Sequence, residues 1–438
     1  MKAIYGNGAL PAGRIEHRHL LREPVSKNCN CRHRWGLRSL GFALSAKVAA
    51  MPNSLSFFRL PPRLRAFFSG VLMLSLTLAA GASAAQVPQA PIEIDAWTAA
   101  EAMGIGVNLG NTLDNTTTWE IGWGNPPVTK ELVQSLKAHG FQVVRVPVAW
   151  DTYAHNGRID RDKIKHVAQV VDWITDAGMF AVVNIHWDGG WIDSDDQKKF
   201  PKTYHTFSPE AEQKFKSYWT QIATYFRDRG PKLIFEGLNE ESDFSGTGSE
   251  RNAFQTLARV NQLFIDTVRA TGGNNARRLL IIAGYQTNID KTTSSNYILA
   301  KDNVPNKLLM SVHYYTPWPF VGMEHDESWG KMASTWGDAR DRAELKEQMD
   351  KMEAWSKKND IPVFIGEFGA TNKKEARSRA KWMASVAISA RARVMVPVLW
   401  DIGLDVSRTP PYTLTPELTF ALQQLQKVNS ENARPASQ

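Results

Sequence analysis

Two glutamates stand where paired carboxyl groups could do acid/base chemistry. Glu240 directly follows the β-rich run 233–239, and Glu367 lies near the end of the run 363–368. Cleaving a glycosidic bond with retention needs two carboxyl groups about 5 to 5.5 Å apart, one protonated to assist the leaving oxygen and one ionised to attack the anomeric carbon. If their strands converge, these residues can supply both. We therefore expect Glu240 to act as general acid/base and Glu367 as nucleophile.

Polar or aromatic residues end most of the other β-rich runs too. Asn239 can hydrogen-bond a sugar 2-hydroxyl, and Arg145 offers a charge that keeps a nearby carboxylate ionised, so we pair Arg145 with Glu367. Any one of these residues alone is more often structural, but together they indicate a site. The supporting residues predicted from these strand ends are Arg145, His186, Asn239, His313 and Tyr315.

A metal site is the alternative use of the two histidines. His186 and His313 could ligate a metal beside Asp188 or Glu240, as in a barrel hydrolase that activates water. However, no His-x-His pair or local ligand cluster anchors such a site, and a histidine that orients a carboxylate requires less. We therefore predict no metal and no cofactor, and a hydrogen bond from Tyr315 to the nucleophile.

Tryptophan is abundant, with 15 residues. Sugar rings stack on such aromatic faces, and nine tryptophans fall in or beside expected loops: Trp119, Trp123, Trp150, Trp187, Trp191, Trp318, Trp329, Trp336 and Trp400. The substrate-binding residues we predict are Asn111, Trp123, Trp187, Trp318 and Trp400. Trp173, Trp219 and Trp382 lie in helical patterns, and we expect them in the core.

The elements that must position these residues alternate along the chain. The β-rich runs are 106–110, 143–149, 180–186, 233–239, 279–285, 308–314, 363–368 and 394–400. The helical patterns between and after them are 128–139, 159–177, 209–227, 251–271, a short one near 294–300, 340–358, 374–390 and 416–428. Eight such alternations without a glycine-rich dinucleotide fingerprint predict an α/β fold, a single (β/α)₈ TIM barrel over 95–430. Polar ends of parallel strands then meet at one face of the barrel, where barrel enzymes hold their active sites.

Charge and cysteine separate an N-terminal leader from this domain. Residues 1–85 hold 12 of the 52 Lys and Arg but 2 of the 44 Asp and Glu, so the rest of the chain is almost neutral. That balance fits a neutral partner better than nucleic acid. The only cysteines, Cys29 and Cys31, also lie in the leader, so the domain has no thiol or disulfide.

The leader ends in an export signal. Basic residues up to Arg65 precede an apolar stretch, and 82–84 reads Ala-Ser-Ala, a pattern that signal peptidase cleaves. Met51 starts a segment of ordinary signal-peptide length and is the expected true start. We expect a secreted or periplasmic monomer with no stable membrane anchor after processing. An uncleaved anchor is the alternative, although the apolar run is shorter than the ~20 residues that span a bilayer.

Several motifs resemble the cellulase family, glycoside hydrolase family 5, and most closely its subfamily 4. They are GVNLGNTLD at 106–114, WGNP at 123–126, VRVPV at 144–148, FEGLNE at 235–240, HYY at 313–315 and IGEFG at 365–369. The resemblance implies a (β/α)₈ barrel and hydrolysis with retention. It also implies Glu240 as acid/base and Glu367 as nucleophile, with Arg145, His186, Asn239, His313, Tyr315 and Trp400 as the matching supporting residues, and no cofactor.

The function implied is a retaining endo-β-1,4-glucanase acting on cellulose-like chains, mixed-linkage β-glucan or xyloglucan. Two departures bear on the substrate: Glu241 stands where the family usually has proline, and Ile402 where subfamily members often have asparagine. A β-mannanase or other retaining β-glycanase is the nearest alternative. A non-catalytic carbohydrate-binding barrel is the alternative of another class, although the chain has both glutamates.

Overall fold

The computed structural model describes residues 93–192, 206–240 and 243–432, and the predicted leader 1–85 lies outside them. A closed barrel of parallel strands forms the centre, in the order β1-β10-β9-β8-β7-β6-β5-β2. The barrel strands are β1 (Gly106–Asn108), β2 (Val143–Val146), β5 (Phe180–Asn184), β6 (Leu233–Glu236), β7 (Leu280–Ala283), β8 (Leu308–Tyr314), β9 (Val363–Phe368) and β10 (Val396–Leu399). Each lies within one of the predicted runs, so the (β/α)₈ prediction is confirmed.

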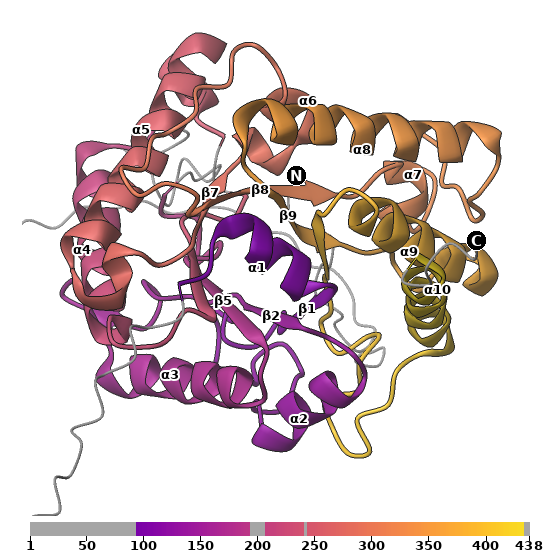
Figure 1. Ribbon diagram of the computed structural model, residues 1–438, viewed down its shortest axis with the longest axis horizontal. Coiled ribbons are helices and arrows are strands. Elements are labelled where there is room, and N and C mark those ends of the chain that lie inside the picture. Colours follow the sequence, from indigo (N-terminus) through magenta and orange to yellow (C-terminus); the bar gives the residue numbers. More distant parts are fainter. Residues whose placement is uncertain (1–92, 193–205, 241–242, 433–438) are drawn as a thin grey trace, which may run out of the picture. The chain divides into compact units, whose positions relative to one another are not determined.

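A ring of helices surrounds this barrel (Figure 1). The outer helices are α2 (Lys130–Ala138), α3 (Arg161–Asp176), α4 (Pro209–Phe226), α5 (Glu250–Ala270), α6 (Ile289–Thr292), α8 (Ala339–Asn359), α9 (Ala376–Arg391) and α10 (Pro416–Asn432). Their starts follow local chemistry: the Ser208 hydroxyl accepts the Ala211 N–H ahead of α4, and Asp338 forms a capping box with Asp341 at α8. The strands bury every residue because the helices cover their outer face.

One helix prediction was wrong in position. We expected the short fifth helix near 294–300, but the helix is α6 at Ile289–Thr292, and 294–300 is turn and irregular chain. Asn288 caps α6 through the Lys291 N–H, a signal that the helical periodicity of the later residues obscured. Two further elements were not expected from the sequence patterns: the short helix α7 (Trp318–Val321) and the hairpin of β3 (Ala154–His155) and β4 (Arg158–Ile159).

The strand starts are closed off by another unexpected helix, α1 (Ala96–Met103), which crosses the middle of the ring in Figure 1. Its buried face packs on apolar residues from the early parts of the strands, including Val143, Ile234 and Phe364. This end of the barrel is therefore filled with apolar side chains and closed by α1. The other end, where the strands finish, is the one left for chemistry.

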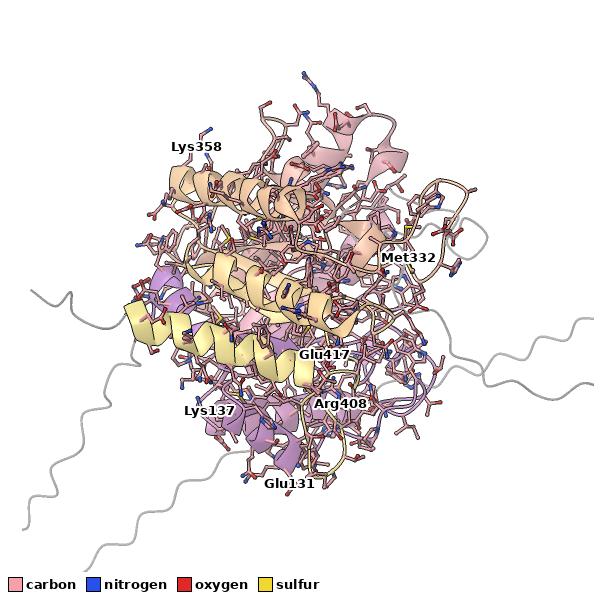
Figure 2. The ribbon with its side chains drawn as sticks, turned by 90° about the vertical axis from the view of Figure 1, so that its right-hand side faces the viewer. Glu131, Lys137, Met332, Lys358, Arg408 and Glu417 are labelled. Atoms are coloured by element: carbon pink, nitrogen blue, oxygen red, sulfur yellow. The ribbon has the colours of Figure 1, made fainter. Side chains whose placement is uncertain are left out.

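From the side, α8, α9 and α10 lie along one flank (Figure 2). Loop residues Met332 and Arg408 appear at the end where α10 begins near Glu417, away from Lys358 near the end of α8. The loops that follow β8 and β10 thus border the mouth at which the strands end. No helix in the described part of the chain is long and apolar enough to cross a membrane.

Candidate active site

The two predicted glutamates meet at the mouth of the barrel. Glu240 lies just beyond β6, Glu367 lies in β9, and His313 of β8 stands between them. The His313 Nδ1 atom is 2.9 Å from Glu240 Oε1 and 3.6 Å from Glu367 Oε2. One carboxyl oxygen of each glutamate and a ring nitrogen of His313 all lie within 4.8 Å of one another. This spacing suits an attack with retention, because an inverting pair needs about 6.5 to 9.5 Å to admit a water molecule.

Glu367 is held at both oxygens. Arg145 Nη1 donates to Oε1 at 2.8 Å, and the Tyr315 hydroxyl donates to Oε2 at 2.9 Å. The register between β8 and β9 shifts just before His313, which brings His313 opposite Glu367. The predicted hydrogen bond from Tyr315 and the predicted pairing with Arg145 are both present.

Arg145 is fully buried and organises the site beneath the two glutamates. Besides Glu367, its Nη1 donates to Asn108 Oδ1 at 3.0 Å, and its Nη2 donates to Asn239 Oδ1 at 2.8 Å. Its Nε donates to Glu236 Oε2 at 2.6 Å. Charge-assisted bonds of this kind are the strong ones, and together they fix the plane of the guanidinium.

Glu236 is a functional-site residue that was not predicted from the sequence. It is fully buried in β6, and its carboxylate also accepts hydrogen bonds from Ser311 Oγ at 2.8 Å and Asn184 Nδ2 at 3.0 Å. Gly366 leaves room for this cluster, since a Cβ there would lie 3.2 Å from Ser311 Oγ. A signal for it exists in the sequence, because a carboxylate inside an otherwise apolar strand run must be paired.

The rings of His186 and Trp400 line one side of the candidate active site. Their rings stack with centroids 5.6 Å apart and planes 8° from parallel. Burial holds the pKa of His186 well below its ordinary range, and the charges of Arg145 and His313 lower it further. His186 is therefore neutral, and its Nδ1 lies 3.3 Å from Asn184 Nδ2, which can donate to it.

The pKa values of the two glutamates shift in opposite directions. Burial raises the pKa of Glu367, and the charge of Glu240 adds to this, against the opposing effects of His313, Arg145 and Tyr315. Burial also raises the pKa of Glu240, but the hydrogen bond and charge of His313, together with the charge of Arg145, act against it, and the pKa of Glu240 lies below its ordinary value. In the free protein the two groups therefore titrate as a pair.

The alternative metal arrangement of His186 with His313 does not form among the described residues. The group there with metal-like geometry is Glu240, His313 and Glu367, and it does not include His186. The carboxylate of Asp188 instead faces the loop that follows β2, where it accepts hydrogen bonds from the backbone N–H groups of Asp151 and Thr152.

The predicted substrate-binding residues are less tightly connected. Asn111 adopts a positive φ of 55°, and its N–H donates to Asp114 Oδ2 at 3.1 Å. Trp187 is 50% exposed, whereas Trp123 and Trp318 are half-buried. Within the described ranges, no hydrogen bond or ring contact joins these three tryptophans to the glutamate cluster.

Three of the nine tryptophans that fall in or beside expected loops have no exposed face for a sugar. Trp150, Trp191 and Trp336 are buried, so their faces pack against protein. Position outside a regular element does not reveal burial when a loop folds back on the barrel. Among the helix tryptophans, Trp219 and Trp382 are fully buried as expected, and Trp173 is half-buried.

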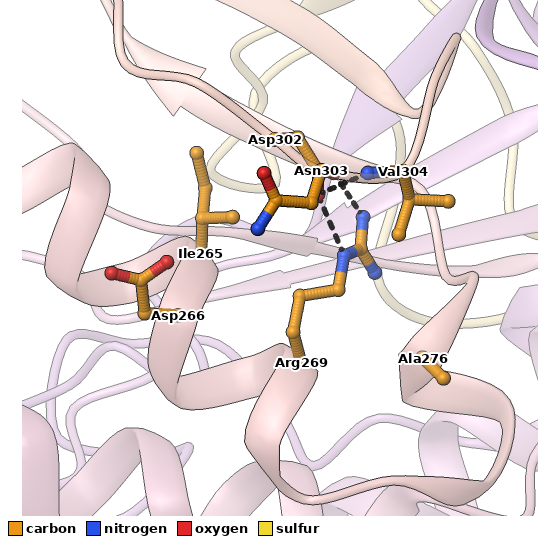
Figure 3. A pocket seen from close by; sticks show the side chains of 7 residues that line it. All are labelled: Ile265, Asp266, Arg269, Ala276, Asp302, Asn303 and Val304. Atoms are coloured by element: carbon orange, nitrogen blue, oxygen red, sulfur yellow. Dashed lines mark hydrogen bonds and ion pairs between the residues drawn. The ribbon is translucent and has the colours of Figure 1, made fainter.

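A separate hollow of about 230 Å³ lies near the end of α5 (Figure 3). Arg269 in its wall pairs with Asp302 and donates to the carbonyl oxygens of Asn275 and Arg278. These contacts join the end of α5 to two neighbouring segments. The helices run back from the mouth, so this hollow is far from the glutamates, and its ion pair has a structural explanation.

Comparisons with known proteins agree with this geometry. Residues 101–405 match the family model described as cellulase (glycosyl hydrolase family 5). An endoglucanase A from Paenibacillus barcinonensis is 34% identical over 341 residues, which cover 69% of this chain and 81% of that protein. A xyloglucan-specific endo-beta-1,4-glucanase from Bacteroides ovatus is 31% identical over 69% of this chain and 64% of its own length.

A solved structure is similar to this chain over most of its length. It is a GH5-4 broad specificity endoglucanase from an uncultured bovine rumen ciliate, 31% identical, with a TM-score of 0.68, covering 77% of this chain and 99% of that one. The family match spans most of the chain and includes both glutamates and every barrel strand. The chain therefore belongs to glycoside hydrolase family 5, the cellulase family.

Proposed function

We propose that this protein is a retaining endo-β-1,4-glucanase in which Glu367 is the nucleophile and Glu240 the general acid/base. The observation that carries the proposal is the carboxyl pair within 4.8 Å, with Arg145 and Tyr315 both bonded to Glu367. Two donors on one carboxyl favour its ionised form, and the partly exposed Glu240 is the one open to a leaving group.

The reaction proceeds by two displacements. Glu240 gives its proton to the glycosidic oxygen while a Glu367 oxygen attacks the anomeric carbon, so the C–O bond to the leaving chain breaks and a glycosyl ester forms. Glu240, now a carboxylate, takes a proton from water, and that water attacks the anomeric carbon and releases Glu367. Each step returns Glu240 to the state that the next one needs.

Substrate binding supplies the protonation that the first step requires. The Glu240 side chain is 32% exposed in the free protein, and a glucan chain across the mouth would cover it. Burial disfavours the charged form of a carboxyl, so this covering raises the pKa of Glu240. The Nδ1 atom of His313 lies 2.9 Å from Glu240 Oε1 and orients the carboxyl group, so that the other oxygen, Oε2, can carry the proton toward the leaving group.

A neighbouring amide can bind the sugar. The side-chain oxygen of Asn239 accepts a hydrogen bond from Arg145 Nη2, which leaves the NH₂ group of Asn239 to donate to a substrate hydroxyl. Stacked Trp400 offers a flat face beside the reacting ring. The similar proteins named for endoglucanase and xyloglucan-specific endoglucanase activity support a β-1,4-glucan backbone as the substrate.

The first test is hydrolysis of barley β-glucan, xyloglucan, carboxymethyl cellulose and mannan by the wild type and by Glu367→Gln. We expect glucan cleavage that the substitution abolishes. Glu131→Gln, an exposed residue of α2, is the matched control and should retain full activity. Activity surviving in Glu367→Gln would mean that the nucleophile is wrong, and cleavage of mannan alone would mean that the substrate class is wrong.

Trapping the intermediate tests the chemistry directly. A 2-deoxy-2-fluoro-β-cellobioside with a fluoride leaving group should add one 2-deoxy-2-fluorocellobiosyl group to the wild-type protein. Peptide mass spectrometry should find this group on Glu367. A label on another residue would refute the proposed roles.

Export is the remaining part of the proposal. The apolar run before Ala82-Ser83-Ala84 supports cleavage by signal peptidase and a secreted or periplasmic enzyme. N-terminal sequencing of exported protein should find a start near Gln86. A retained segment 65–85 would argue for a membrane anchor instead.

A further inference from the structure

The buried carboxylate of Glu236 has no part in the two displacements, although it makes the shortest of Arg145's hydrogen bonds. Its bond to Arg145 Nε is 2.6 Å, against 2.8 Å from Arg145 Nη1 to Glu367. Glu236 is fully buried and lies below the catalytic pair, so it cannot touch a glucan in the mouth. A buried charge is costly unless it is paired and hydrogen-bonded, and Glu236 meets this condition through Arg145.

Each hydrogen bond between Glu236 and the side chains that the structure describes is donated to Glu236. Oε1 accepts from Ser311 Oγ, and Oε2 accepts from Arg145 Nε and Asn184 Nδ2. A carboxylate offers only acceptors, so this arrangement fits the ionised form. One guanidinium therefore stands between two carboxylates, of which only Glu367 is chemically used.

We propose that Glu236 is a positioning residue that divides the positive charge of Arg145 between itself and the nucleophile. This inference rests on the proposed function, because it assigns Glu236 an effect on Glu367. Through Nε, Glu236 sets the rotation of the guanidinium, so that Nη1 faces Glu367 and Nη2 faces Asn239. It also limits how strongly Arg145 stabilises the charge that the attack must use up.

The consequence has a definite sign. Without the negative charge of Glu236, Arg145 acts on Glu367 alone, and a repelling charge is also removed. Both changes lower the pKa of Glu367. The acidic limb of the pH profile should move down, while the attacking carboxylate becomes a weaker nucleophile.

Glu236→Gln is the principal variant, and glutamine fits the site. Its carbonyl oxygen can accept from Arg145 and Asn184, and its NH₂ group can donate to the Ser311 hydroxyl. We expect the acidic limb of kcat/KM, measured with an aryl β-cellobioside, to move down by about one pH unit. The plateau should fall about tenfold, with inactivation by the 2-fluoro sugar slowed similarly and KM nearly unchanged.

Two controls separate charge from structure. Glu236→Asp keeps the charge and should restore the acidic limb to within a few tenths of a unit of wild type. Ser311→Ala removes one hydrogen bond to Glu236 but no charge, so its acidic limb should stay in place. Glu236→Asn and Glu236→Asp form a second pair of equal size that differs in charge.

The outcomes are distinct. If Glu367→Gln remains active, the proposed function fails before this inference is reached. If Glu367→Gln is inactive but the acidic limb of a folded Glu236→Gln stays in place or moves up, only the inference fails. If neither neutral variant folds, Glu236 has a purely structural role, and the inference is likewise overturned.

Discussion

The two ends of the barrel interior are built from the same strands, yet they differ sharply in polarity. On four strands, an apolar residue facing α1 is followed two positions later by a polar residue. That polar residue is Glu236 itself or one of the side chains that donate a hydrogen bond to Glu236. These pairs are Val143 and Arg145, Val182 and Asn184, Ile234 and Glu236, and Leu309 and Ser311. A step of two keeps a side chain on the same face, so polarity changes along the barrel axis rather than between faces.

This change in polarity separates the end of the barrel that stabilises the fold from the end that holds the active site. The apolar end gains from burial, at about 25 cal/mol for each Å² removed from water. The polar end loses that gain and must satisfy every buried charge. Four predictions exploit this contrast, from the largest expected effect to the smallest.

The largest effect belongs to the mouth. Glu240→Gln removes the proton donor, and kcat on β-glucan should fall about 10² to 10⁴-fold. A dinitrophenyl leaving group needs no proton, so with that β-cellobioside the first step should be nearly restored. Steady-state and burst kinetics measure this, and an equal loss on both substrates would remove Glu240 from the acid role.

A substitution at the apolar end should lower the stability of the fold and leave the activity unchanged. Phe364 lies in the same strand as Glu367 but faces α1, fully buried. Phe364→Ala should lower the free energy of unfolding by about 3 to 5 kcal/mol, mostly through the cavity it leaves. Urea unfolding gives this value, and kcat per folded molecule should stay near wild type. A large loss of kcat with little destabilisation would contradict the division between the two ends.

The third prediction concerns pH and a buried carboxyl at the mouth. Burial raises the pKa of Asp114 to about 6, from 3.8. The folded state thus holds the proton more tightly than the unfolded chain, so Asp114 contributes stability below about pH 4 that is lost as pH rises through about 6. The loss should be at most about 3 kcal/mol.

Unfolding measurements at pH 4 and pH 8 test this, with Asp114→Asn as the comparison. The variant has no proton to release, so the difference in stability between the two pH values should shrink. An unchanged difference would place the responsible group elsewhere.

The smallest effect is expected at the rim. Trp187 is 50% exposed, so its removal leaves no cavity. Trp187→Ala should weaken glucan binding by about tenfold or less, which is about 1.4 kcal/mol, with little change in melting temperature. Isothermal titration with cellohexaose, using the inactive Glu367→Gln background, measures it. Unchanged affinity would exclude Trp187 from the substrate-binding residues.

Much of the site could be predicted because strand ends are visible as breaks in apolar runs. Glu240, Glu367, His313 and Tyr315 were found that way, and the structure brings them together. Glu236 was missed because it lies inside a strand, where an isolated carboxylate gives no sign of its partner. Trp150 and Trp191 fall in or beside expected loops and yet are buried, because loop position alone does not determine exposure.

The sequence by itself determined the alternation of strands and helices, and hence the barrel, because the spacing of apolar residues along the chain indicates which segments form strands and which form helices. It also determined the two carboxyls and their family. Only the tertiary structure decided that α1 closes the barrel, and that Arg145 bonds both Glu236 and Glu367. Those two glutamates are 131 residues apart in the chain, and one guanidinium joins them only after the strands close into a barrel, which is a long-range event that no local pattern encodes.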